Sequence, residues 1–386
     1  MSRYLFVVPP LTGHINPTVG VGGELAARGH EVAWVGHPAT LRALLPSGAR
    51  VLPALDDELE QRIQDAHQHW LRLRGMAVVK FFWQDFMIPL ARAMVPGVEA
   101  AVREFEPDVV VADQQALAGP LVAHRTGVPW VTSASTPAEL FRPLRSMPKV
   151  EDWVRDQLDD LVREFVGRST PDIRFSERLV LVFTSSALVG DGFPEHYVFT
   201  GPALGSRPDP VRFPWDWLAE GQRRVLVSLG TLNGAAGERF FGEVADAVAD
   251  LHGVQVVIVA PPGVVGAVPE HVLLTERVPQ LALLPHLDAV VSHGGHNTVC
   301  EALAHGLPLV ITPIRDDQPL IADQVVSAGA GIRLTYSRVR APEIRDALEE
   351  VLHRPSYADA ARRVQQSFQA AGGAPTAADH LEAVVA

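Results

Sequence analysis

Short apolar runs alternate with helical patterns along almost the whole chain. A run that is apolar at every position is typical of a strand buried on both faces, as in parallel sheets covered by helices on both sides. Residues 4–8 form such a run, and further predominantly apolar segments lie at 31–36, 50–53, 108–112, 130–134, 179–183, 223–230, 254–260, 272–274, 289–292, 309–312 and 331–334. Helical patterns separate most of them, including one with Pro17 in its first turn that ends at Ala27. The pattern therefore predicts a doubly wound α/β protein with parallel sheets.

A stretch rich in proline and glycine at residues 201–222 interrupts this alternation and lacks sustained periodicity. Such a composition is typical of a connection between domains. At 386 residues, two hydrophobic cores are also a better expectation than one. We therefore predict two tandem Rossmann-like domains, 1–203 and 223–386, joined by a linker at 204–222. The last helix, at about 375–386, either stays with the second domain or packs back on the first.

Aromatic side chains are concentrated between residues 58 and 94, where the helical periodicity is imperfect. The group consists of Trp70, Phe81, Phe82, Trp83 and Phe86, with Met87 beside them. Most aromatic residues in such a stretch belong to a core. As a group, however, they could equally line an apolar cleft that binds a ligand. The sequence leaves both interpretations open.

Acidic residues outnumber basic ones, 45 against 33, which gives a formal net charge of −12. Nucleic acids and anionic membranes require a basic surface, so neither is an expected partner. The single cysteine, Cys300, leaves no disulfide framework and no cysteine-based zinc site, and we expect it in the core. The sequence shows neither a signal-peptide pattern nor a run of about eighteen apolar residues. We therefore expect a soluble cytoplasmic protein.

One predicted strand, at residues 289–292, leads through His293-Gly294-Gly295 into a helical pattern that begins at His296. Two glycines allow a tight turn and let a ligand approach the backbone closely. The N–H groups of a helix N-terminus, with about half a positive charge, favour an anion such as a phosphate. From this feature alone, an ordinary turn between a strand and a helix explains the pattern equally well.

Further polar residues follow the predicted strands at the edge where parallel sheets bind ligands. His14 comes after the first strand and Asp113 after the strand at 108–112, so both are expected at one edge. Gly230-Thr231 and the turn at His293 have comparable positions in the second domain. A carboxylate can hold the proton on one imidazole nitrogen and leave the other as a base. Such a base contributes about 10² to 10⁴ to a reaction rate.

Three motifs together resemble the nucleotide-sugar-dependent glycosyltransferases of family 1. They are TGHINP after the first strand, SLGT at the start of the second domain, and VPQLALL…SHGGHNTVCEALAHGLPLVITPIRDDQ within residues 277–318. The chain is particularly similar to the bacterial macrolide and natural-product members. Its segment EPDVVVADQQALAGPLVAHRTGVPWV also matches their pattern around a second catalytic residue. The resemblance covers nearly the whole chain and implies the GT-B fold, an α/β fold in which two Rossmann-like parallel-sheet domains face a cleft.

The resemblance also implies roles for individual residues. His14 would deprotonate the acceptor hydroxyl, and Asp113 would orient His14. At the nucleotide base of the donor, the contacts would be Val278 (through its backbone) and Gln280, and at the ribose Glu301. The diphosphate would be bound by Thr231, His293, Gly295, Asn297 and Thr298. The sugar would be bound by Asp317 and Gln318. An acceptor pocket would be lined by Trp70, Phe82, Trp83, Phe86, Met87, Thr136 and Phe141.

The implied reaction is transfer of a hexose, with inversion, from a nucleotide diphosphate sugar to a hydroxyl of a hydrophobic natural product. The pair Asp317-Gln318 resembles that of glucose-using members and favours UDP-glucose, with a dTDP-sugar as the alternative. An aromatic carbon in place of the hydroxyl stays open. No Asp-x-Asp triplet, the usual Mg²⁺ carrier of the other major glycosyltransferase fold, occurs in the sequence. We therefore expect neither a metal nor another cofactor.

Other functions compete with this hypothesis. Another GT-B enzyme is one alternative, either a cell-wall N-acetylglucosaminyl transferase or a nucleotide-sugar epimerase, but the former has a more glycine-rich first loop than PPLTGH. A non-catalytic auxiliary partner of a transferase is another, although such proteins tend to lose the base and diphosphate residues present here. A dehydrogenase is disfavoured because no complete GxGxxG motif follows the first strand. The oligomeric state is not predicted.

Overall fold

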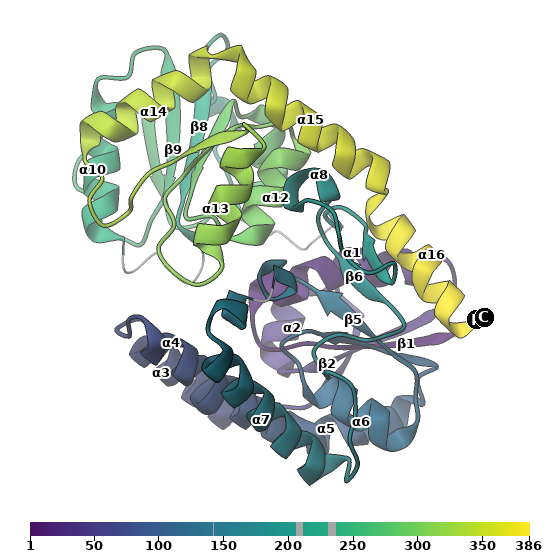
Figure 1. The fold of residues 1–386 in the computed structure, drawn as a ribbon. Helices are drawn as coiled ribbons and strands as arrows, with labels where there is room; N and C mark the ends of the chain where they lie inside the picture. The colour runs from purple at the N-terminus through teal and green to yellow at the C-terminus, as the bar shows by residue number, and fades with distance from the viewer. Residues whose placement is uncertain (142, 206–210, 231–236) are drawn as a thin grey trace. The chain divides into compact units, whose positions relative to one another are not determined.

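A computed structural model of the chain describes residues 1–141, 143–205, 211–230 and 237–386, and its ribbon is drawn in Figure 1. The chain divides into two compact units. Unit 1 comprises Met1–Phe183, Gly192–Pro208 and Gly372–Ala386, and unit 2 comprises Thr184–Asp191 and Asp209–Ala371. Each unit is built on a parallel sheet covered by helices, so the predicted α/β class is confirmed.

The sheet of unit 1 contains parallel strands throughout its described residues. In spatial order they are β3 (Arg50–Pro53), β2 (Glu31–Gly36), β1 (Arg3–Val7), β4 (Val109–Asp113), β5 (Trp130–Ala134), β6 (Val180–Val182) and β7 (Tyr197–Phe199). β1 lies between β2 and β4, with Val7 beside Val35 on one side and Ala112 on the other. Because all neighbours run in the same direction, the carboxyl ends of these strands share one edge of the sheet.

Helices cover both faces of this sheet (Figure 1). They are α1 (Thr12–Ala27), α2 (Pro38–Leu44), α3 (Asp57–Trp70), α4 (Met76–Lys80), η1 (Phe81–Met87), α5 (Ile88–Phe105), α6 (Ala118–Thr126), η2 (Ala138–Phe141), η3 (Pro143–Ser146), α7 (Pro148–Phe165) and α16 (Gly373–Val385). Apolar side chains of α5, α6 and α7 bury one face, and those of α1, α2 and α16 bury the other. The core of unit 1 is therefore two layers, one on each side of the sheet.

Two helices of unit 1 differ from the prediction. α1 begins at Thr12, so Pro17 lies inside the helix instead of in its first turn. Proline clashes with the carbonyl four residues earlier, here that of Gly13, and the helix accommodates it. The imperfect periodicity of residues 58–94 also has a structural cause, because η1 is a π-helix between α4 and α5. Its wider turn shifts the side chains away from the 3.6-residue period of an α-helix.

Unit 2 has the same layered construction on a smaller sheet. The strand order is β10 (Val272–Thr275), β9 (Val254–Val259), β8 (Arg223–Ser228), β11 (Ala289–Ser292), β12 (Leu309–Ile311) and β13 (Gly331–Arg333), all parallel. The helices are α8 (Ser186–Val189), α10 (Glu238–Ala249), α11 (Gln280–Leu283), α12 (His296–Ala304), α13 (Gln318–Ser327), α14 (Ala341–His353) and α15 (Pro355–Ala371), with short 3₁₀ helices η4 (Trp215–Trp217) and η6 (Leu284–His286). Side chains of α10 and α14 pack on one face of the sheet.

Unit 2 departs from the sequence pattern at two places. The helical pattern that begins at Pro342 forms two helices, α14 and α15, because Arg354 between them is extended and Pro355 starts a new helix. The segment Thr184–Asp191 also belongs to this unit, although it precedes the predicted linker. It carries α8, and the hydroxyl of Ser185 lies 2.7 Å from that of Ser367 on α15.

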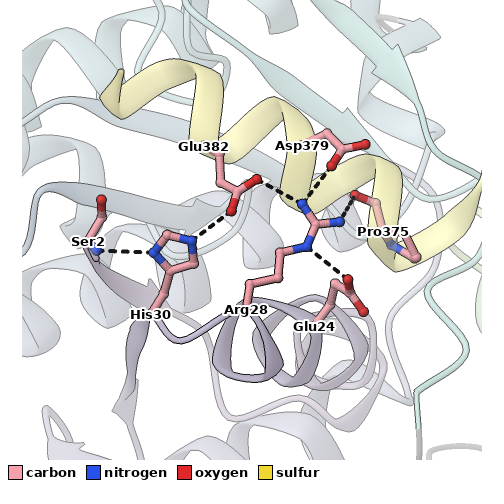
Figure 2. A network of polar contacts seen from close by, with 7 residues as sticks. All are labelled: Ser2, Glu24, Arg28, His30, Pro375, Asp379 and Glu382. Carbon is pink, nitrogen blue, oxygen red and sulfur yellow. Dashed lines mark hydrogen bonds and ion pairs between the residues drawn. The ribbon is translucent and has the colours of Figure 1, made fainter.

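The C-terminal helix α16 belongs to unit 1, where it packs against α1. Arg28, at the end of α1, donates from Nη1 to Asp379 (2.6 Å) and Glu382 (2.8 Å) and from Nη2 to the carbonyl of Pro375 (3.1 Å). Its Nε also bonds Glu24 at 2.9 Å. Figure 2 shows this guanidinium at the centre of the contacts that join the two helices.

A second contact reaches the same acidic residue of α16. His30 Nδ1 accepts the backbone N–H of Ser2 at 3.0 Å, so its Nε2 carries the proton and donates to Glu382 at 2.7 Å (Figure 2). The start of the chain, the end of α1 and the last helix are therefore fixed to one another. Within the part of the chain that the structure describes, no helix has the length and apolarity needed to cross a membrane.

Replacing Arg28 with alanine is expected to lower the unfolding midpoint by roughly 2–4 °C and to speed hydrogen exchange in α16, because three carboxylates lose a shared donor. The matched control is Arg163→Ala, which removes an exposed pair with Asp160 on α7 and should shift the midpoint by less than about 1 °C. Calorimetry and amide exchange measure both effects. An Arg28→Ala protein that matches the wild type in both would contradict this role.

Candidate functional site

A histidine and an aspartate meet at the carboxyl edge of the unit 1 sheet. His14 lies in the first turn of α1, directly after β1, and Asp113 is the last residue of β4. Because β1 and β4 are parallel neighbours, the turns that follow them begin side by side. His14 Nδ1 lies 2.8 Å from Asp113 Oδ1. The structure thus brings together the two residues that the sequence singled out, although 99 positions separate them.

A third residue, Ser135, completes this cluster and was not predicted. It follows β5, the other neighbour of β4, and its hydroxyl donates to Asp113 Oδ2 at 2.6 Å. The same oxygen lies 2.7 Å from His14 Nδ1. Serine is too common for its type to attract attention in a sequence. The usable signal is positional, because β4 and β5 are adjacent strands that end at the same edge.

The hydrogen bonds of this cluster define which imidazole nitrogen can act as a base. The Asp113 side chain is fully buried, and Oδ1 also accepts the backbone N–H of Gln115 at 2.9 Å. An ionised carboxylate only accepts hydrogen bonds, so the proton of a neutral His14 lies on Nδ1, toward Asp113. Nε2 is then the basic nitrogen. The His14 side chain keeps 14% of its surface exposed, so a small molecule can approach it.

The glycine turn of unit 2 lies between β11 and α12, as predicted. Gly294 has φ of +90°, and Gly295 is the N-cap residue, with no side chain that caps the helix. Asn297 and Thr298 lie in the first turn of α12 and are partly exposed. A β-carbon at Gly295 would lie 2.6 Å from Nε2 of His293, and one at Gly230 would lie 2.6 Å from its Cε1. Both positions therefore require glycine, because the imidazole occupies the space.

His293 itself is buried and neutral. It is 8% exposed, and burial lowers the pKa of its imidazole to about 4, partly opposed by a hydrogen bond to the backbone of Ser228. Its Nδ1 has no hydrogen-bond partner among the described residues. A buried imidazole that is neutral at pH 7 can donate one hydrogen bond without carrying a charge. His293 can therefore donate either to the backbone of Ser228 or to a phosphate oxygen bound beside the N-terminus of α12, but not to both.

Other predicted donor residues surround this turn within unit 2. Gln280, the first residue of α11, donates to Glu301 of α12 at 2.6 Å, which joins the residues assigned to the base and the ribose. Val278 lies in the preceding loop and is partly exposed. Gln318 is buried, and its Oε1 accepts the backbone N–H groups of residues 314 and 315 at 2.9 and 3.1 Å.

Gln318 therefore shapes the turn in front of α13, where Asp317 is the N-cap residue. Thr231, which was assigned to the phosphates, lies outside the described residues. The structure thus groups Gln280 with Glu301, and Asp317 with Gln318, while His293 lies against the glycine turn. The sequence could assign residues to this region but not the hydrogen bonds among them.

The structure separates the proposed acceptor residues into three groups. Met87 is fully buried and Trp83 is 3% exposed, both within the hydrophobic core of unit 1. These two side chains have almost no exposed surface with which to line a cleft. Phe82 and Phe86 pack partly buried against the same core. Trp70, Thr136 and Phe141 lie elsewhere in unit 1, with Phe141 36% exposed and Thr136 8% exposed.

Cys300 is buried in α12, as expected, and burial raises the pKa of its thiol to about 12. It is therefore protonated at neutral pH and is no nucleophile. Among the residues that the structure describes, no group of three or more histidine, cysteine, aspartate or glutamate side chains is arranged to hold a metal ion.

Comparison with known proteins extends the resemblance in the sequence. The family model described as "Erythromycin biosynthesis protein CIII-like, C-terminal domain" matches residues 243–384. The 4'-demethylrebeccamycin synthase of Lentzea aerocolonigenes is 29% identical over 427 aligned residues, which cover 100% of both chains. The uncharacterized UDP-glucosyltransferase YojK of Bacillus subtilis (strain 168) is 26% identical over 100% of this chain and 98% of its own length.

A solved structure gives the same result for the fold. The crystal structure of the glycotransferase of kitacinnamycin is similar to this chain with a TM-score of 0.78 at 25% identity, over 99% of this chain and 98% of that one. The two parallel sheets, the strand-end residues and these whole-length similarities lead to one assignment. The protein is a glycosyltransferase of the GT-B fold, and over its whole length it is similar to bacterial natural-product glycosyltransferases.

Proposed function

We propose that the protein moves a hexose, with inversion and without a metal, from a nucleotide diphosphate sugar to a hydroxyl of a hydrophobic natural product. The donor we favour is UDP-glucose, with a dTDP-sugar as the alternative. The observation that carries this proposal is the contact of His14 with Asp113 and Ser135 at the carboxyl edge of the unit 1 sheet. The proposed location is the cytoplasm.

The first part of the reaction concerns the acceptor. Its hydroxyl would donate to Nε2 of His14, which takes the proton as the oxygen attacks the anomeric carbon. The imidazolium that forms carries its second proton on Nδ1, toward the buried carboxylate of Asp113. The carboxylate stabilises this cation and holds the ring in place. A base of this kind contributes about 10² to 10⁴ to the rate.

The second part concerns the leaving group. As the new carbon–oxygen bond forms, the bond from the anomeric carbon to the diphosphate breaks, and its electron pair leaves with the phosphate oxygen. Negative charge therefore grows on the diphosphate. The N–H groups at the start of α12 are donors that need no rearrangement to stabilise this charge. The single N–H of the neutral His293 would also donate to a phosphate oxygen once it leaves the backbone of Ser228. Attack opposite to the leaving group inverts the configuration at the anomeric carbon.

The donor is inferred from the residues around α12 and α13. Glu301, held by Gln280 at 2.6 Å, offers a carboxylate to two ribose hydroxyls. Gln318 uses its Oε1 within the turn, which leaves its amide N–H groups for a sugar hydroxyl. Asp317 would accept from neighbouring hydroxyls. UDP-glucose is favoured by this pair and by the similarity to YojK of Bacillus subtilis (strain 168), an uncharacterized UDP-glucosyltransferase.

Replacing His14 with alanine is expected to lower transfer by about 10² to 10⁴ while leaving donor binding intact. Donor binding is measured by thermal shift with UDP, dTDP and their sugars, where a ligand at 100 times its Kd stabilises the fold by about 2.7 kcal/mol. Transfer is measured by mass detection of glycosylated acceptors. The control is His380→Ala, an exposed residue of α16. Undiminished transfer in His14→Ala would overturn the mechanism, and flat responses to every nucleotide would overturn the function.

The buried His293 gives the wild-type protein a distinct pH dependence. Its pKa is about 4 in the folded protein and near 6.5 when unfolded, so the unfolded chain binds more protons in that interval. The stability from His293 is thus present above pH 6.5 and is lost as the pH falls toward 4.

Between pH 6.5 and pH 4.5, the free energy of unfolding of His293→Asn is expected to fall by roughly 2–3 kcal/mol less than that of the wild type. Urea denaturation at the two pH values measures this difference, with His380→Asn as the exposed control. The variant should also bind the donor more weakly at pH 7, because one phosphate contact is lost. Equal acid destabilisation of the variant and the wild type would show that His293 is not held neutral by burial.

A further inference from the structure

Glu139 is a carboxyl group near the catalytic cluster that has no assigned role. It lies on η2, four positions after Ser135, and its side chain is 14% exposed. Its Oε2 is buried and has no hydrogen-bond partner among the described residues. Among the described residues, the cation that lies close to it is Arg174, whose Nη1 is 3.9 Å from Oε2, beyond hydrogen-bond distance. A buried carboxyl oxygen without a donor is costly, and none of the described residues donates to this one.

Arg174 cannot supply that partner in this arrangement. Its Nε donates to Asp172 Oδ1 at 2.9 Å and its Nη2 to Oδ2 at 2.6 Å, which is a bidentate pair. The guanidinium also lies over the rings of Trp83 and Phe175, 5.7 and 5.8 Å from their centroids. These contacts fix Arg174 toward Asp172. Within the part of the chain that the structure describes, Glu139 Oε2 therefore has a charged neighbour but no hydrogen-bond donor.

Other unpartnered polar groups lie at the same edge of the sheet. Gln114 follows Asp113 directly and is 1% exposed, yet neither atom of its amide has a partner among the described residues. Its backbone N–H donates to the carbonyl of Ser133 at 3.1 Å, which places it beside β5. The hydroxyl of Ser133 is likewise buried and unpartnered within the described chain. Native proteins leave few such groups, and several at one edge indicate a ligand or ordered water.

The charges near Glu139 indicate which kind of ligand group would fit. Burial raises the pKa of Glu139 to about 7, while the charge of Arg174 opposes this rise and those of Asp172 and Asp113 add to it. Among the described residues, the carboxyl groups of Glu139, Asp172 and Asp113 outnumber the guanidinium of Arg174, so an anionic group would be disfavoured. A hydroxyl or an amine would instead donate to the vacant carboxyl oxygen. The exposed ring of Phe141, two positions further along η2, offers an apolar surface nearby.

We propose that Glu139 is a specificity-determining residue that binds an O–H or N–H donor of the acceptor, distinct from the hydroxyl that receives the sugar. The preferred acceptor is then a hydrophobic molecule with a second polar donor group. Gln114, at the same sheet edge, is a further polar contact for this group. This inference rests on the proposed function of unit 1 as the acceptor-binding part of the enzyme.

The test uses naphthols that differ only in the second donor. 1-Naphthol is compared with 1,5-, 1,6- and 1,7-dihydroxynaphthalene and with 5-amino-1-naphthol, and the readout is the ratio of kcat/KM for each against 1-naphthol. For the best of them the wild-type ratio should be about tenfold or more, the effect of one hydrogen bond to a charged group. Glu139→Leu should reduce the ratio toward one, and Glu139→Gln, which keeps an accepting oxygen, should be intermediate.

The control is Glu164→Gln on α7, which removes a carboxylate paired with Arg92 at the surface, 2.9 Å apart. It should leave the ratio unchanged. The ratio is informative because a general structural defect lowers the rate with both acceptors, whereas loss of a specific donor contact lowers only one. Across pH 6 to 8 the wild-type ratio should change as Glu139 ionises, and that of Glu139→Gln should stay flat.

Thermal shifts with the same naphthols, measured without a nucleotide sugar, separate this inference from the proposed function. If binding shows a preference that depends on Glu139 but no transfer occurs, the inference stands and the proposed reaction is wrong. If transfer occurs but Glu139→Leu leaves the kcat/KM ratio unchanged, the inference is wrong and the proposed reaction stands. A wild-type protein that neither binds nor glycosylates any of the substituted naphthols better than 1-naphthol would overturn the inference as well.

Discussion

The parallel pairing of β1 with β4 is the constraint on which the proposed chemistry depends. It carries the chain from the end of β1 into the first turn of α1 and places the end of β4 beside it, so that His14 and Asp113 lie 2.8 Å apart. Neither residue has a defined role without the other. The carboxylate selects the tautomer of the imidazole, and the imidazole, with Ser135, satisfies the buried carboxylate. The pairing of His14 with Asp113, and with it the proposed base, is thus a consequence of strand order.

The glycine turn of unit 2 follows a different physical principle. There Gly295 and the distant Gly230 leave space for an imidazole that is buried and therefore neutral. Burying His293 is energetically unfavourable. The side chain lies beside a helix N-terminus and its backbone N–H groups. In the proposed reaction, the N–H groups and the dipole of that helix would stabilise a growing anion without a mobile counter-ion. We propose that unit 1 supplies proton removal and unit 2 supplies charge stabilisation.

The strands and several site residues could be predicted from the sequence, and the residues that could not be predicted were missed for physical reasons. Apolar runs located the strands, because a buried parallel strand leaves a continuous pattern, and strand ends then located His14 and Asp113. Ser135 and Glu139 were missed, because ordinary residue types acquire meaning only through neighbours that the fold brings together. The π-helix η1 distorted the expected period, and that is why Trp83 and Met87 could not be recognised as core. The contact of Arg28 with Glu382 spans 354 positions and leaves no local signal.

The central claim is that Asp113 holds His14 with its proton on Nδ1, so that Nε2 is the base. Nitrogen-15 NMR of the histidine rings tests this directly, with His14→Asn used to assign the His14 signals. At neutral pH the ring is predicted to carry a protonated Nδ1 and an unprotonated Nε2, and Asp113→Ala should remove this preference. A His14 ring with its proton on Nε2, or one whose tautomer is unaffected by Asp113→Ala, would contradict the account.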